Sequence, residues 1–144
     1  MSAETPNRRR AREAALQMLY QWEVGRASAH EAIVTYWPAR EEEERLAEPH
    51  RQFANDLVKG TVGRVEEIDK LIGARAQNWR VERMAVIDRL ILRLGIYELL
   101  AVPDTPPKVV INEAVELARS YSGEEAVPFV NGVLDAIRKD LGRA

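Results

Sequence analysis

Four arginines within five positions are the residues of this chain best suited to chemistry. They are Arg8, Arg9, Arg10 and Arg12. A guanidinium group presents a planar fork of N–H donors that fits phosphate oxygens and can also stack on bases. The pattern therefore indicates the binding of a polyanion, with an affinity that falls as salt rises. A solvated, frayed terminal tail is the alternative interpretation of the same residues.

The arginines lead without a break into a predicted helix over residues 7–24. Apolar side chains recur there at spacings of three and four, which is the period of one helix face. These are Ala11, Ala14, Ala15, Met18, Leu19 and Trp22. Leu16 and Tyr20 are predicted to share a second face, which we expect to meet a protein partner. Because arginines in a first turn oppose the positive end of the helix macrodipole, an external anion would stabilise this arrangement.

Six further helices are predicted, with short connections between them. Ser28 and Glu31 have the spacing of a capping box at the start of the second helix, and Pro38 is expected to end it. Thr105 is the expected N-cap of the sixth helix. The remaining helices are expected over residues 49–61, 65–76, 82–100 and 125–141, with a disordered lead-in over 1–6, an acidic linker over 40–45 and a connection over 78–80.

One dipeptide in the last predicted helix conflicts with that prediction. Asn131-Gly132 is a typical β-hairpin signal. The surrounding apolar residues nevertheless follow the helical period over three turns, and no other segment alternates like a strand. We therefore predict a helix, with Gly132 allowing a neighbouring backbone to come close.

The predicted helix over 82–100 is apolar around most of its circumference, which is typical of a central, buried helix. On a helical wheel Glu82, Arg89 and Arg93 fall within about 40° of one another, so they are predicted to form one solvated stripe. Asp88 and Glu98 lie outside this stripe, and their carboxylates need partners. Those partners are either groups within the fold or groups of another protein, and the pattern leaves both open.

Composition limits the possible functions. The chain has 144 residues, 46% of them hydrophobic, which suits one globular domain with a real core. Its net charge of −2 is uneven, because residues 1–12 carry +3 and the remainder −5, so a nucleic-acid site should be local. Without cysteine, and with two isolated histidines, no metal or other cofactor is expected. No membrane span or secretory signal is visible, which predicts a cytoplasmic protein without a membrane partner.

No catalytic constellation is visible, so the chain is not expected to be an enzyme. The stretch Gly60-Thr61-Val62-Gly63 is not followed by the Lys-Ser/Thr of a phosphate-binding loop. Binding is the better hypothesis, and RNA recognition often stacks unpaired bases on aromatic side chains. Phe129 is a candidate for such a platform, although its pattern alone favours a core position.

Several stretches together resemble the NusB family of bacterial transcription antitermination factors. The first is Arg8-Arg9-Arg10-Ala11-Arg12-Glu13 with Leu19-Tyr20-Gln21-Trp22. The second runs from Ile87-Asp88-Arg89 to Tyr97-Glu98-Leu99. The third and fourth are Pro107-Lys108-Val109-Val110-Ile111-Asn112-Glu113-Ala114 and Phe129-Val130-Asn131-Gly132-Val133-Leu134-Asp135. The resemblance covers nearly the whole chain in order and is least distinctive over residues 38–80.

This resemblance implies an all-α fold of about seven helices in two small packed bundles, roughly residues 1–63 and 64–144 of one RNA-binding domain. It implies binding to the boxA RNA of ribosomal RNA operons together with NusE, in a complex with NusA, NusG and RNA polymerase that reads through terminators. It also allows a homodimer. A helical protein–protein adaptor without intrinsic RNA binding is the alternative function.

The resemblance also implies roles for individual residues. The implied RNA-binding set is Arg8, Arg9, Arg10, Arg12, Lys108, Glu125 and Phe129. Glu82 and Asp88 match acidic contacts to NusE, and Tyr20 joins them through its predicted place on the second face of the first helix. Pro128 departs from the basic residue that some relatives carry before the phenylalanine, which leaves one RNA contact in question.

Overall fold

A computed structural model describes residues 6–40, 46–76 and 80–143 of the chain. Within these ranges the chain forms seven α-helices, two short 3₁₀ helices and no strand, which confirms the predicted all-α class. The elements in chain order are α1 (Pro6–Glu23), α2 (Ala29–Ala39), α3 (Glu48–Gly63), α4 (Val65–Arg75), η1 (Val81–Arg83), α5 (Val86–Ala101), α6 (Pro107–Tyr121), η2 (Glu124–Ala126) and α7 (Val127–Asp140). The predicted lead-in except Pro6, residues 41–45 of the predicted acidic linker and residues 78 and 79 of the predicted connection lie outside the described ranges.

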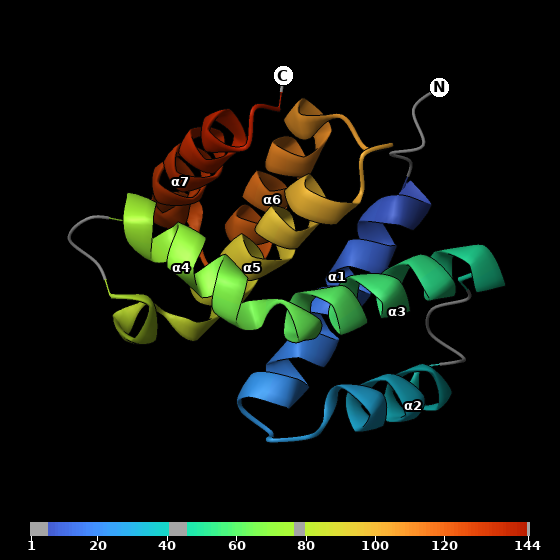
Figure 1. Ribbon diagram of the computed structural model, residues 1–144. Helices are drawn as coiled ribbons and strands as arrows, with labels where there is room; N and C mark the ends of the chain where they lie inside the picture. Colours follow the sequence, from blue (N-terminus) through green and yellow to red (C-terminus); the bar gives the residue numbers. More distant parts are fainter. Residues whose placement is uncertain (1–5, 41–45, 77–79, 144) are drawn as a thin grey trace. The chain divides into compact units, whose positions relative to one another are not determined.

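The chain divides into two compact units, residues 1–63 and residues 64–144. The first unit consists of α1, α2 and α3, and α1 contacts both of the other helices (Figure 1). Ala11, Ala14 and Ala15 on α1 are completely buried, and their small side chains let neighbouring helices approach closely. Leu16 is also buried, so the prediction that it shares an accessible face with Tyr20 is wrong.

The start of α2 has the predicted capping box. The backbone N–H of Glu31 donates to Ser28 Oγ at 3.0 Å, and the backbone N–H of Ser28 donates to Glu31 Oε1 at 2.9 Å. These two bonds satisfy donors that the first turn of a helix leaves without intrahelical partners. Pro38 does not end the helix as predicted, because α2 continues through it to Ala39.

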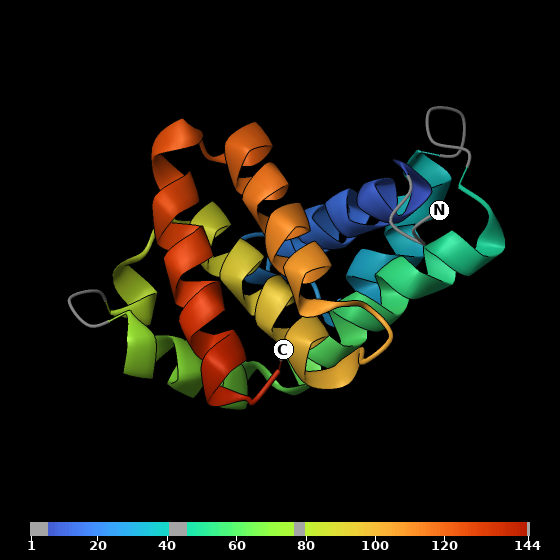
Figure 2. The same ribbon diagram turned by 90° about the horizontal axis from the view of Figure 1, so that it is seen from above.

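The second unit is built around α5, which contacts α4, α6 and α7. Figure 2 shows α6 and α7 side by side, running in opposite directions on either side of the η2 turn. The glycine that permits a close approach is Gly95 on α5, where an added Cβ would lie 3.2 Å from Leu134 Cδ1. Gly132 lies within α7, as the helical prediction required, but an added Cβ there would meet nothing within 4 Å. The close approach predicted at Gly132 is therefore wrong.

The predicted solvated stripe on α5 does not exist. Arg93 and Arg89 are only 6% and 7% exposed. Arg93 donates through Nε and Nη2 to the two carboxylate oxygens of Asp69 on α4, each at 2.8 Å. Arg89 Nη1 donates to the backbone carbonyl of Val81 at 3.2 Å. The two arginines therefore bind neighbouring elements to α5 from inside the unit.

Two predicted helix starts are also wrong. Glu82 lies on η1, and α5 begins only at Val86, because the backbone of the two residues before it, Met84 and Ala85, is not helical. At the sixth helix the N-cap is Pro106, with Pro107 as the first helical residue. Thr105, predicted as the cap, is instead buried at 2% exposure, and its carbonyl accepts a hydrogen bond from Arg143.

Within the described ranges, no helix combines the length and apolar character needed to cross a bilayer.

The Arg93–Asp69 pair gives a first test of the fold. Asp69→Ala leaves a guanidinium group buried with fewer acceptors, so we expect the free energy of unfolding to fall by about 2–3 kcal/mol. Glu67→Ala is the control, since it removes the partner of Arg64 in a pair whose side chains are 40% and 52% exposed. Exposed pairs of this kind contribute little. Urea unfolding of both variants measures the difference, and equal losses would contradict the assigned role of Asp69.

The capping box gives a pH-dependent prediction. The backbone hydrogen bond from Ser28 lowers the pKa of Glu31 below its ordinary value of 4.5. Because the unfolded chain then binds more protons, the stabilisation is complete above about pH 4.5 and is lost as pH falls through the folded-state pKa. We expect wild type to exceed Glu31→Gln in stability by a constant amount near neutral pH, and by a shrinking amount in acid. A difference that stays constant down to about pH 3 in denaturant titrations would refute this assignment.

Candidate nucleic-acid interface

The arginine cluster, which we define as Arg8, Arg9, Arg10 and Arg12, lies in the first two turns of α1. No acidic residue lies in that first turn to offset the macrodipole. Arg9 is exposed, and Arg8 and Arg10 are half-buried. These three side chains therefore place cationic groups on the accessible surface, where they can meet an anion.

Arg12 differs from the other members of the cluster. It is only 2% exposed, so the structure does not present it as the surface contact that the resemblance implies. Its Cζ lies 5.4 Å from the ring centroid of Phe53 on α3, and the Cζ of Arg8 lies 3.8 Å from the same centroid. These distances are within the range of cation–π attraction. The start of α1 is thus attached to α3 rather than being a solvated tail.

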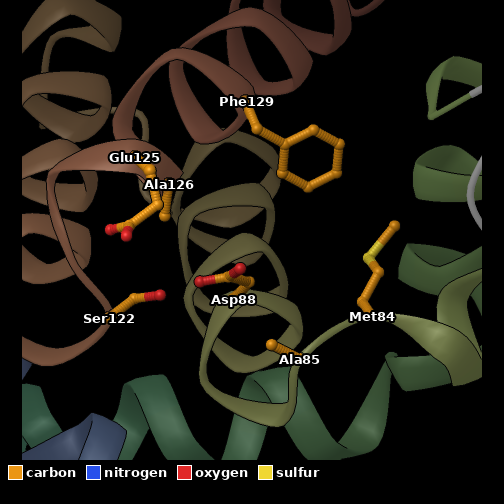
Figure 3. A pocket seen from close by; sticks show the side chains of 7 residues that line it. All are labelled: Met84, Ala85, Asp88, Ser122, Glu125, Ala126 and Phe129. Atoms are coloured by element: carbon orange, nitrogen blue, oxygen red, sulfur yellow. The ribbon is translucent and has the colours of Figure 1, made fainter.

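A cavity of about 460 Å³ lies within the second unit and brings several predicted residues together. Its lining comes from the start of α5, the segment before it, the end of α6, η2 and the first turn of α7 (Figure 3). The lining residues are Met84, Ala85, Asp88, Ser122, Glu125, Ala126 and Phe129. The ring of Phe129 and the side chain of Met84 form one side of it, and the carboxylates of Asp88 and Glu125 lie on the other (Figure 3).

The turn before α7 positions two of these residues. Gly123 has φ of 143°, a conformation that favours glycine, and it precedes η2 directly. Arg119 on α6 donates through Nε to both carboxylate oxygens of Glu124 at 3.0 Å, and this bond raises the pKa of the Arg119 guanidinium group. The pair is largely exposed, so it adds only modestly to stability. It helps to hold η2 where Glu125 and Phe129 reach the cavity.

Asp88 is the unusual polar group of the cavity. It is the third residue of α5, where the macrodipole favours a negative charge. Its Oδ1 atom is buried and accepts no hydrogen bond from the described part of the chain. Glu98, the other carboxylate left open by the sequence, is 1% exposed and so belongs to the interior of the fold. Asp88 is therefore the better candidate for contact with a partner.

The other predicted site residues lie outside this cavity. Lys108 is exposed in the first turn of α6, and Glu82 is exposed on η1. Tyr20 is 40% exposed on α1, with Val24 one turn later at 48%. The implied RNA-binding set is thus divided, with its arginines in the first unit and Lys108, Glu125 and Phe129 in the second.

Sequence reasoning missed two contributors to these sites. Phe53 falls in the helix predicted over residues 49–61, and no spacing rule links it to arginines some forty positions earlier. Met84 was expected inside a helix, because its apolar character fitted the pattern that continues into α5. Among the described residues no group of three potential metal ligands occurs.

The Asp88 oxygen without a hydrogen bond allows a test of whether this residue serves a partner or stabilises the fold. A buried carboxylate oxygen without a hydrogen bond costs stability, and the favourable dipole offsets part of that cost. We expect Asp88→Asn to raise the free energy of unfolding by about 1 kcal/mol in urea titrations. Glu98→Gln, at a buried carboxylate that does have a partner, should lower it by about 1–2 kcal/mol. A loss of stability in Asp88→Asn would indicate a structural role instead.

Comparison with known proteins identifies the family. The sequence profile of the NusB family matches residues 9–139. The transcription antitermination protein NusB of Koribacter versatilis (strain Ellin345) is 48% identical over 141 residues, which cover 98% of this chain and 94% of that protein. Its counterpart in Myxococcus xanthus (strain DK1622) is 47% identical over 136 residues, covering 94% and 97%.

Solved structures agree with the sequence relatives. NusB of T. maritima superposes with a TM-score of 0.82 at 35% identity, covering 94% of this chain and 92% of that chain. A crystal structure of antitermination factors NusB and NusE in complex with dsRNA contains a chain that matches with a TM-score of 0.83 at 30% identity, covering 93% and 97%. With sequence profile, relatives and fold in agreement, this chain belongs to the NusB family.

Proposed function

We propose that this protein is a transcription antitermination factor that binds the boxA RNA of ribosomal RNA operons together with NusE. The observation that carries the proposal is the arginine cluster, three of whose members reach the surface near the start of a helix whose first turn contains no acidic residue. The chain has a net charge of −2, so its affinity for RNA must come from local groups such as these. Membership of the NusB family and the match to a NusB–NusE–dsRNA structure support the same function.

Direct RNA contacts are proposed for groups from both units. Arg8, Arg9, Arg10 and Lys108 provide cations for phosphates, while Phe129 offers a ring for stacking and Glu125 an acceptor for base N–H groups. Arg12 is left out of this surface set because it is buried. In this proposal both units serve one RNA-binding domain, and catalysis and cofactors have no part in it.

Contacts with NusE are proposed for Tyr20, Glu82 and Asp88. Tyr20 is an exposed aromatic residue, a type enriched at protein interfaces. Asp88 offers a buried acceptor at the cavity, and an N–H donor of a partner would satisfy it. The complex then joins NusA, NusG and RNA polymerase in the cytoplasm, and self-association through the Tyr20 face is an alternative use of that surface.

A helical adaptor without intrinsic RNA binding is the second candidate. The exposed pair Tyr20 and Val24 favours it, because two apolar side chains one turn apart suit a protein partner. The two candidate functions differ in whether the arginine cluster binds RNA. The salt dependence of RNA affinity therefore distinguishes them.

Removing the surface arginines tests the proposal. Affinity for boxA RNA should fall with salt at a log–log slope of about −0.7 for each phosphate contacted. The triple variant Arg8→Ala, Arg9→Ala, Arg10→Ala should flatten this slope by about 2 while leaving the thermal midpoint nearly unchanged. Fluorescence anisotropy with labelled RNA over a salt series measures the slope.

A matched control removes three exposed cations elsewhere, with Lys59→Ala, Lys70→Ala and Arg83→Ala combined. We expect its salt slope to stay near that of wild type. An unchanged slope in the arginine variant, or an equal change in the control, would show that the cluster is not the RNA site. Binding to NusE without any RNA affinity would favour the adaptor.

A further inference from the structure

Phe53 receives two arginines of the cluster on its ring. Arg8 and Arg12 lie one turn apart on α1, with their Cζ atoms 3.8 and 5.4 Å from the Phe53 centroid. The ring comes from α3, and α1 and α3 contact each other within the first unit. Arg12 is buried and Phe53 and Arg8 are half-buried, so the ring lies between the interior and the surface.

We propose that Phe53 is a positioning residue for the RNA site, holding the Arg8 guanidinium group in place before RNA arrives. The inference rests on the proposed function, and it adds to it a residue that touches no RNA. An arginine side chain has several rotatable bonds, and fixing it on a phosphate costs conformational entropy. A guanidinium group already stacked on a ring has lost part of that freedom, so less affinity is lost on binding.

The ring of Phe53 also offsets part of the electrostatic repulsion that the arginines experience at the start of α1. The macrodipole repels cations there, and four arginines lie within these two turns. The negative face of an aromatic ring attracts a guanidinium group, whereas an aliphatic side chain of similar size would only fill the space. Because a stacked guanidinium group keeps its N–H donors at its edge, Arg8 can lie on Phe53 and donate to a phosphate at the same time.

The substitution Phe53→Leu separates the two roles of the ring. Leucine keeps an apolar side chain on α3 but removes the π face. We expect the affinity for boxA RNA, measured by anisotropy at fixed salt, to fall about two- to fivefold. Phe53→Tyr, which keeps the ring, should restore wild-type affinity. Thermal midpoints of each variant confirm folding, and Phe53→Met replaces the leucine variant if that one fails to fold.

A double-mutant cycle tests whether Phe53 acts through Arg8. In an Arg8→Ala background, Phe53→Leu should weaken RNA binding no further. A purely structural role would lower the affinity by the same factor in both backgrounds, and that result would overturn the proposal. Full RNA affinity in Phe53→Leu would overturn it as well.

A measurement on the free protein keeps the inference separate from the proposed function. The ¹⁵N order parameter of Arg8 Nε should be lower in Phe53→Leu than in wild type, and it requires no RNA. If wild type shows no salt-dependent RNA binding, the proposed function fails, and the order parameter still decides whether Phe53 holds Arg8. An unchanged order parameter would show that it does not.

Discussion

The second unit depends on the compensation of two guanidinium groups buried along α5. Arg93 is matched by both carboxylate oxygens of Asp69, which ties α4 to α5. Arg89 donates to the carbonyl of Val81, which holds η1 against the same helix. Buried charges need an opposite charge or hydrogen-bond acceptors, and here these acceptors lie on the elements that precede α5 in the chain. Because the bond from Arg89 holds η1 against α5, the chain turns before α5 and Met84 lines the cavity.

Local placement of charge would allow this acidic chain to bind RNA as proposed. Its net charge offers no general attraction to a polyanion, so cations must be concentrated where RNA binds. The start of α1 concentrates them against the helix macrodipole, and the ring of Phe53 compensates part of the resulting cost. In the second unit the cavity combines the ring of Phe129 with the carboxylates of Asp88 and Glu125, which suits contacts with bases or N–H donors rather than with phosphates. Each unit thus carries groups proposed to contact RNA and groups proposed to contact a protein partner.

Sequence patterns predicted the helices well and the buried charges poorly. Helical periodicity and the capping box at Ser28 are local signals, and they placed most elements within a few residues. The helical wheel put Arg93 on a solvated stripe because it assumes that a charged residue faces water. Nothing in the local pattern could show that Asp69, on another helix, pairs with Arg93. In the candidate site, the sequence pattern singled out Phe129 and Asp88 and the family resemblance suggested their partners, whereas Phe53 required the packing of α1 on α3 to be known.

As proposed, RNA and NusE bind to separate surfaces of this one protein, and each should strengthen the binding of the other. Labelled boxA RNA can be titrated with this protein alone, with NusE alone and with both. We expect the pair to bind RNA more tightly than either component does. If the pair binds boxA RNA no more tightly than NusE alone, the proposal is contradicted, because the arginine cluster would then add nothing to RNA recognition.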